Sequence, residues 1–131
     1  MLVHRFLTED IVGAFYATYN ALGFGYSESI CSKGLAVELQ RRSLRVEREV
    51  PVEVVLHGVV LGTLRLDMVV EEAIVVENKA SKEIGDADVR QILTYLKGSR
   101  YEVGLLLHFG PKAAHRRFLY TNDRKSSIPS V

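Results

Sequence analysis

The sequence predicts a single α/β domain in which a mixed β-sheet is flanked by helices, with the elements in the order ααβββαββ. Three observations predict this fold. The 131 residues fit one domain rather than two, and 47% of them are hydrophobic, as in an ordinary globular protein. The spacing of apolar residues changes from a helical period to a period of about 2 near residue 46, and returns to the helical period near residue 86. This late helical segment lies between two predicted strands, which allows a parallel crossover.

Two helices are predicted before the first strand. Residues 8–22 carry apolar side chains at helical spacing, with Thr8 as a candidate N-cap and Gly23 at the end. The second helix is predicted over residues 28–42, with Ser27 as its N-cap. Its apolar seam consists of Cys31, Leu35 and Leu39.

An antiparallel meander of three strands is predicted next. Between residues 46 and 54 valines alternate with charged residues, and Pro51 favours a position at the edge of the sheet. The second strand is predicted over residues 59–70 and the third over residues 74–80, joined by a turn at 71–73. On the second strand, one face is expected to hold Leu64, Leu66 and Met68.

A third helix and two further strands complete the predicted domain. The helix is expected over residues 86–97 and ends before a glycine. Residues 101–109 are almost wholly apolar, which is typical of a strand buried on both faces, and the last strand is expected over residues 115–121. The domain is therefore expected to span residues 1–121, followed by a polar tail over residues 122–131.

The composition excludes several classes of protein. The 17 basic and 16 acidic residues give a net charge of +1, so a nucleic-acid contact needs a local basic patch rather than bulk charge. The single cysteine rules out an internal disulfide framework and suits a reducing compartment. No apolar run approaches the ~20 residues that span a membrane, and the N-terminus does not have the pattern of a secretory signal. We therefore expect a cytoplasmic protein that makes no membrane contact.

Two carboxylates are expected to face each other on the second and third strands. A three-residue turn at 71–73 makes the numbers of paired residues sum to 144, which places Asp67 opposite Glu77. Like charges in this position are destabilising unless something compensates them, and a hard divalent cation would do so. Lys79 shares the face of Glu77, where it can steady a phosphate or orient an attacking water. The alternative is a solvated sheet face on which Asp67 pairs with Arg65 or Lys79.

The second predicted helix carries two further carboxylates near its apolar seam. Glu38 follows Leu35 by three residues, and Glu28 precedes it by seven. A carboxylate on a buried face is costly unless it is paired or bound to a metal. The alternative for Glu38 is an ion pair with Arg41, Arg42 or Arg45.

Polar residues elsewhere allow a functional and an ordinary interpretation. Gln91 and Tyr95 lie four residues apart on the third predicted helix, where a glutamine can hold a water or contact a phosphate, or simply flank the apolar face. Basic residues gather at 41–48 and 112–117, and such clusters hold a phosphate backbone or solvate the ends of elements.

The ordered set of these motifs resembles the PD-(D/E)XK nuclease superfamily. An acidic helix is followed by an aspartate and a Glu-x-Lys on a hairpin, and then by Gln-x-x-x-Tyr on the next helix. More narrowly, the chain is similar to the small bacterial and archaeal GxxExxY proteins assigned to that superfamily, whose signature falls on residues 25–31 with Cys31 in place of the tyrosine. Asn78 stands where these proteins commonly have an apolar residue. The similarity covers about residues 8–121, and its further segments are 35–39, 48–52, 65–67, 76–80, 91–96 and 103–110.

This resemblance implies a restriction-endonuclease-like fold, with a four-stranded mixed core sheet, and a Mg²⁺- or Mn²⁺-dependent hydrolase of nucleic-acid phosphodiesters, with DNA favoured as the substrate. It implies that the metal is held by Asp67, Glu77 and Glu38. It also implies that Lys79 and Gln91 take part in catalysis together with the two hairpin carboxylates. The alternative is a non-catalytic nucleic-acid-binding or protein-interaction module on a nuclease fold. A homodimer is compatible with the small size and the edge strand.

Overall fold

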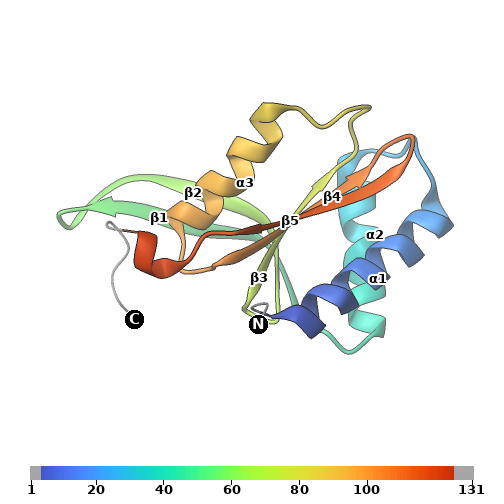
Figure 1. The fold of residues 1–131 in the computed structure, drawn as a ribbon, viewed down its shortest axis with the longest axis horizontal. Helices are drawn as coiled ribbons and strands as arrows, with labels where there is room; N and C mark the ends of the chain where they lie inside the picture. The colour runs from blue at the N-terminus through green and yellow to red at the C-terminus, as the bar shows by residue number, and fades with distance from the viewer. Residues whose placement is uncertain (1–3, 126–131) are drawn as a thin grey trace.

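The computed structural model describes residues 4–125 and confirms the predicted order of elements (Figure 1). Ser27 caps the second helix as expected, because its Oγ accepts a hydrogen bond from the Ile30 N–H at 3.2 Å. The first helix begins at Arg5, so Thr8 is not its N-cap. The elements are α1 (Arg5–Leu22), α2 (Glu28–Arg41), β1 (Val46–Leu56), β2 (Val59–Val70), β3 (Ile74–Lys79), α3 (Asp86–Gly98), β4 (Val103–Phe109), β5 (Ala113–Leu119) and a 3₁₀ turn (Asn122–Arg124).

The sheet has five strands in the spatial order β1-β2-β3-β4-β5. The first three strands form the expected antiparallel meander, β3 and β4 are parallel, and β5 returns antiparallel to β4. The resemblance implied a four-stranded core, and the sheet has one strand more. Strand β1 lies at the edge, where Pro51 interrupts no ladder on the outer side.

Helices cover both faces of the sheet. Helices α1 and α2 pack on one face and α3 packs on the other (Figure 1). All of β4 is buried, which explains why its sequence is apolar throughout rather than alternating. None of the helices within residues 4–125 is long and apolar enough to cross a membrane.

The hairpin of β2 and β3 has the predicted register but an unpredicted break. Met68 pairs with Val76, so the paired numbers sum to 144, and the ladder between the two strands stops at this pair. Leu66 packs in the core under α3, whereas Met68 packs in the core under α1 and α2, so the expectation that these two residues share a face is wrong. The alternation of side chains between the two faces of β2 is interrupted at Asp67. Glu49, which lies opposite Asp67 on β1, has a positive φ of 54°. Asp67 therefore lies where β2 turns away from β3.

The start of the expected polar tail lies against the domain. Residues 122–124 form the 3₁₀ turn, and the Lys125 ammonium donates to the carbonyl oxygens of Ser99 at 3.0 Å and Tyr101 at 2.7 Å. The rest of that tail, residues 126–131, lies outside the described residues.

Candidate active site

Asp67 is held in one orientation at the break between β2 and β3. Its Oδ2 accepts hydrogen bonds from the backbone N–H of Asn78 at 3.1 Å and from the Asn78 side-chain amide at 2.8 Å. Its Oδ1 accepts one from the Ser32 hydroxyl on α2 at 3.1 Å. Asn78 is fully buried, so the carboxylate is fixed by partners that cannot move far.

Glu77 is the most deeply buried carboxylate near this point. The residue is 5% exposed, and its Oε1 is buried without a hydrogen-bond partner among the described residues. Burial, the larger cause, and the nearby Asp67 carboxylate together raise the pKa of Glu77 to about 7. Lys79 and the backbone N–H of Asp67 oppose this rise without cancelling it.

Lys79 connects the hairpin to α3. Its Nζ donates to the Gln91 Oε1 at 2.7 Å and lies 3.6 Å from the Glu77 Oε2 and 3.7 Å from the Asp88 Oδ1. The Gln91 amide in turn donates to the Tyr95 hydroxyl at 3.0 Å. Gln91 thus links Lys79 to Tyr95 through the two ends of its side-chain amide.

Glu28, the first residue of α2, also lies at this site. Burial raises its pKa, the carboxylates of Asp67 and Asp88 add to the rise, and Lys79 opposes it. The backbone N–H of Ala80, directly after β3, also opposes the rise in the pKa of Glu28. The site therefore draws side chains from the start of α2, from the β2–β3 hairpin and from α3.

Glu38 is placed differently from the expectation. Its carboxylate accepts hydrogen bonds from Arg41 at 3.4 Å and Arg42 at 3.0 Å, the ion-pair alternative considered from the sequence. It is ten residues further along α2 than Glu28, which corresponds to about 15 Å of helix. The structure does not bring Glu38 together with the hairpin carboxylates, and Glu28 stands there instead.

The position of each glutamate on the helical wheel explains this difference. At about 100° per residue, Glu28 lies about 20° from Leu35, on the same side as the buried Ser32. Glu38 lies about 60° away from Leu35 on the opposite side, at the border of the buried face. The spacing of seven residues between Glu28 and Leu35 was the stronger signal. For Ser32 and Asn78 we find no comparable signal in the sequence.

The donor set suits a hard divalent cation. Within residues 4–125 no cluster of three or more His, Cys, Asp or Glu side chains is close enough to hold a metal by itself. Mg²⁺ is commonly bound by one or two carboxylates, with water and substrate phosphate supplying the other ligands. Asp67 and Glu77 provide two such carboxylates, and the buried Glu77 Oε1 is an acceptor to which none of the described residues donates. The residues present therefore fit the cation.

Comparison with known proteins identifies the family of the chain. The model of a family described as PD-(D/E)XK nuclease superfamily matches residues 5–118. No curated protein matches the chain significantly. A solved structure described as "Crystal structure of SSO0001" is similar, with a TM-score of 0.57 and 25% sequence identity over 71% of this chain and 50% of that one, so the chain spans half the length of that protein. Because the family match extends from α1 to β5, the chain belongs to the PD-(D/E)XK nuclease superfamily.

Proposed function

We propose that the chain is a metal-dependent nuclease that hydrolyses phosphodiester bonds of nucleic acid, with DNA as the favoured substrate. One observation carries the proposal. The buried Oε1 of Glu77 has no hydrogen-bond partner among the described residues. It lies near the carboxylate of Asp67, which three hydrogen bonds hold in one orientation. Members of the superfamily are generally dependent on a divalent metal, and this pair of carboxylates is where one fits.

Asp67 and Glu77 would hold Mg²⁺ or Mn²⁺. Ser32 and Asn78 keep the Asp67 carboxylate aimed in one direction, as partners behind a metal ligand typically do. When bound, the cation lowers the pKa of water and neutralises negative charge on the phosphate oxygens.

Lys79 would act on the phosphate and on the attacking water. Its ammonium has three N–H donors, of which Gln91 takes one at 2.7 Å. Glu77 at 3.6 Å and Asp88 at 3.7 Å are ion-pair contacts too long for hydrogen bonds. The remaining N–H donors would therefore turn to the oxygens of the pentavalent transition state, where a fixed positive charge is most effective. The amide oxygen of Gln91 accepts a hydrogen bond from Lys79, and its nitrogen donates one to Tyr95. Gln91 would therefore position Lys79 rather than contact the substrate.

Glu28 would take the part that the resemblance assigned to Glu38. It lies beside Asp67 and Lys79 and would hold the cation directly or through a water. Glu28 is also the glutamate of the Gly25-x-x-Glu28 pattern, which supports placing the chain in the GxxExxY group of the superfamily. The tyrosine of that signature is here Cys31, a buried side chain in the core under α2.

The test is metal-dependent cleavage by the purified protein. Single-stranded DNA, duplex DNA and RNA are each incubated with Mg²⁺, with Mn²⁺ and with EDTA. We expect cleavage with either cation and none with EDTA. Asp67→Ala should lose both cleavage and Mn²⁺ binding in calorimetry, and the matched control Asp123→Ala, on the 3₁₀ turn, should keep both.

Equal cleavage by wild type and Asp67→Ala would indicate a contaminating nuclease and contradict the proposal. Absence of cleavage on every substrate, together with absence of Mn²⁺ binding, would favour a non-catalytic module on this fold. DNA binding that weakens with salt would then identify that module as nucleic-acid-binding.

A further inference from the structure

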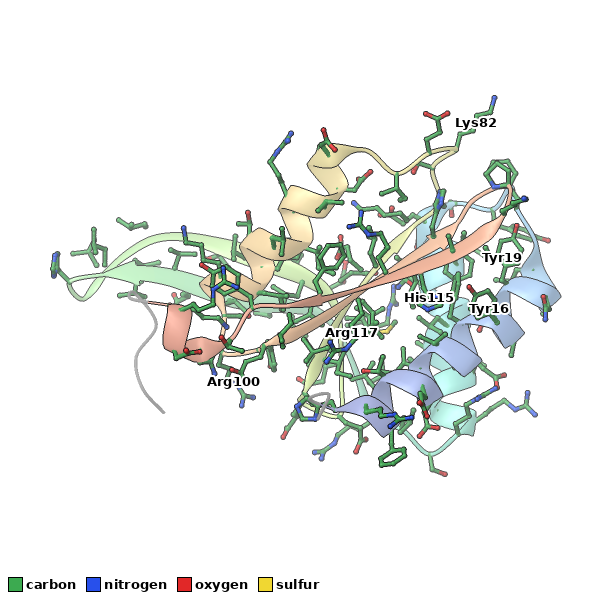
Figure 2. The ribbon with its side chains drawn as sticks, viewed as in Figure 1. Tyr16, Tyr19, Lys82, Arg100, His115 and Arg117 are labelled. Atoms are coloured by element: carbon green, nitrogen blue, oxygen red, sulfur yellow. The ribbon has the colours of Figure 1, made fainter. Side chains whose placement is uncertain are left out.

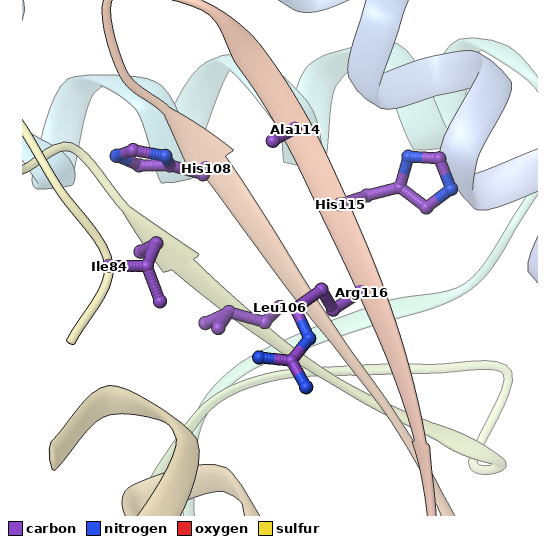
Figure 3. A pocket seen from close by; sticks show the side chains of 6 residues that line it. All are labelled: Ile84, Leu106, His108, Ala114, His115 and Arg116. Carbon is purple, nitrogen blue, oxygen red and sulfur yellow. The ribbon is translucent and has the colours of Figure 1, made fainter. Parts of the chain in front are cut away.

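A small cavity lies beside the candidate active site, between β4, β5 and the loop that connects β3 to α3. Figure 3 shows the side chains that line it, and its volume is about 160 Å³. Its walls are mainly apolar, with basic side chains at the rim, and its lining residues are Ile84, Leu106, His108, Ala114, His115 and Arg116. Nothing in the proposed reaction uses it.

The strand register places this cavity next to the reacting residues. Leu106 on β4 pairs with Glu77 on β3, and His108 pairs with Lys79. On the other side of β4, Leu106 pairs with Arg116 of β5. Because neighbouring strands are about 4.8 Å apart, the backbone of Arg116 lies about 10 Å from that of Glu77. At about 3.4 Å of rise per nucleotide in one strand, this distance corresponds to a few nucleotides of substrate.

Arg116 carries a positive charge that no carboxylate in the described part of the chain pairs. Its guanidinium lies over the Phe118 ring, 5.0 Å from the ring centroid, and it enters no ion pair within residues 4–125. Other arginines of the chain, such as Arg42, are paired with carboxylates. The aromatic face restricts the guanidinium without neutralising it, so the charge remains available to an anion.

His108 is fixed at the inner wall of the cavity. Its Nε2 lies 2.6 Å from the carbonyl oxygen of Ser81, and a side chain at Gly110 would collide with its ring, at 2.4 Å from Cε1. His115 lies on the other side of β5, where its Nδ1 is 2.9 Å from the Tyr16 hydroxyl on α1 (Figure 3). The shape of the cavity is therefore set by Ile84, Leu106, His108 and Ala114, with Arg116 at the rim.

We propose that this cavity, the side pocket, holds one unpaired nucleotide of a single-stranded substrate a few nucleotides from the cleaved phosphodiester. The base would lie against the apolar walls, and Arg116 would bind its phosphate. This inference rests on the proposed nuclease function and specifies its substrate as single-stranded or locally opened nucleic acid.

The chemistry of the side pocket favours a nucleotide over other ligands. Apolar walls suit the face of a base but not a free phosphate, whereas an unpaired arginine suits a phosphate but not an apolar ligand. The cavity volume equals that of about five molecules of liquid water, which is enough for one ring system. It is below the volume range of sites for drug-sized molecules. A base inside a duplex is stacked and paired and has to be taken out of the helix before it can enter such a pocket.

The first test measures binding without cleavage. A fluorescently labelled twelve-nucleotide oligo(dT) is titrated in EDTA, and its affinity is followed by anisotropy. We expect Arg116→Ala to weaken binding about tenfold and to reduce the slope of log K against log salt by about 0.7, the value for one single-stranded phosphate contact. Arg100→Ala is the matched control, because Arg100 also lies over an aromatic ring, 4.9 Å from the Tyr101 centroid, at the far end of the β4–β5 pair (Figure 2).

The second test separates the base from the phosphate. Oligonucleotides with one abasic position each keep every phosphate, and we expect at least one of them to bind several-fold more weakly than oligo(dT). Ala114→Leu fills the pocket from an exposed position on β5 and should remove this difference while leaving the melting temperature within a few degrees. A blunt duplex of equal length should bind more weakly than the single strand.

Three binding results would overturn the side pocket, and one kinetic result would do so as well. These are equal affinity of wild type and Arg116→Ala with an unchanged salt slope, equal affinity for abasic and complete oligonucleotides, and tighter binding of the duplex. Failure of the nuclease proposal would give a different result. Oligonucleotide binding would still depend on Arg116, but neither Mg²⁺ nor Mn²⁺ would support cleavage. If Arg116→Ala cleaves nucleic acid with the same KM as the wild type, the nuclease proposal stands and the side-pocket proposal is contradicted.

Discussion

The ammonium of Lys79 lies 3.6 Å from the Glu77 carboxylate, yet the pKa of Glu77 is raised to about 7. Burial outweighs the attraction of the lysine, and the Asp67 carboxylate adds to the effect. Near neutral pH the buried carboxyl group is therefore poised between its neutral and its charged form. Under the proposed function, a divalent cation at the site would compete with this proton, and metal binding would be coupled to pH through Glu77.

The stability of the metal-free protein should decrease as the pH rises from about 5 to about 8. The folded protein binds the Glu77 proton more tightly than the unfolded chain does, because the pKa rises from 4.5 to about 7 on folding. Between these values the free energy of unfolding falls with pH, by about 3 kcal/mol in total at 1.36 kcal/mol per pH unit. Urea unfolding in EDTA at several pH values measures this loss.

Glu77→Gln is expected to abolish that component of the pH dependence, since the amide does not titrate. The matched control is Glu53→Gln, an exposed position on β1, which should retain it. Addition of Mn²⁺ should stabilise the wild type more at pH 8 than at pH 5. A wild-type stability that rises over this window in parallel with that of Glu77→Gln would contradict the burial argument.

Glu28 and Glu38 provide a matched pair on one helix. Glu28 lies beside Asp67 and Lys79, whereas Glu38 is engaged by Arg41 and Arg42. Glu28→Gln should weaken Mn²⁺ binding and lower turnover by about 10-fold or more. Glu38→Gln should leave both within about twofold and cost the fold less than about 1 kcal/mol, as for other exposed helical ion pairs. Calorimetry measures the Mn²⁺ affinity of both variants. A larger loss of affinity in Glu38→Gln than in Glu28→Gln would support the sequence-based prediction that Glu38 holds the metal.

Most of the fold could be predicted because the periodicity of the apolar residues is set by local geometry. The bounds of β2 were predicted to the residue, and the parallel crossover through α3 followed from one helix between two strands. The three-residue turn fixed the register of the β2–β3 hairpin. These features depend on neighbours in the sequence, which a single chain reveals.

The break in β2 could not be predicted because it depends on tertiary packing. Leu66 and Met68 are two residues apart, as two residues on one face of a regular strand are. Only the structure shows that they pack in separate cores on opposite faces of the sheet. The same break lets Asn78, which alternates away from Glu77, reach Asp67 from the other side. The choice between Glu28 and Glu38 was within reach of the sequence, since the helical wheel already favoured Glu28.

Asn78 should be needed for metal affinity although it is not a ligand. Its side-chain amide donates to Asp67 Oδ2 at 2.8 Å from a fully buried position. Asn78→Ala should lower Mn²⁺ affinity about 10- to 100-fold, the usual effect of removing a partner behind a metal ligand. It should also cost about 1–3 kcal/mol of stability, because Asp67 loses a buried donor.

The control for this change is Asn122→Ala, which removes a side-chain hydrogen bond to the Arg100 carbonyl at an exposed site. It should leave Mn²⁺ binding unchanged. Calorimetry and thermal melts on the two variants give both quantities. An Asn78→Ala protein that binds Mn²⁺ like the wild type would show that Asp67 is oriented by Ser32 and the backbone alone.

Lys79 and Gln91 should behave as one unit in turnover. Lys79→Ala removes the ammonium and should lower kcat by about 100-fold or more while Mn²⁺ binding persists, because the lysine is not a ligand. Gln91→Ala should lower kcat less, since Lys79 keeps its charge and loses only the 2.7 Å hydrogen bond that positions it. If Gln91 acts through Lys79, the double variant should be no slower than Lys79→Ala, because the second change has nothing left to disturb. The cycle is measured as kcat on one oligonucleotide at saturating Mn²⁺. Additive losses in the double variant would instead mean that Gln91 contacts the substrate or the attacking water itself.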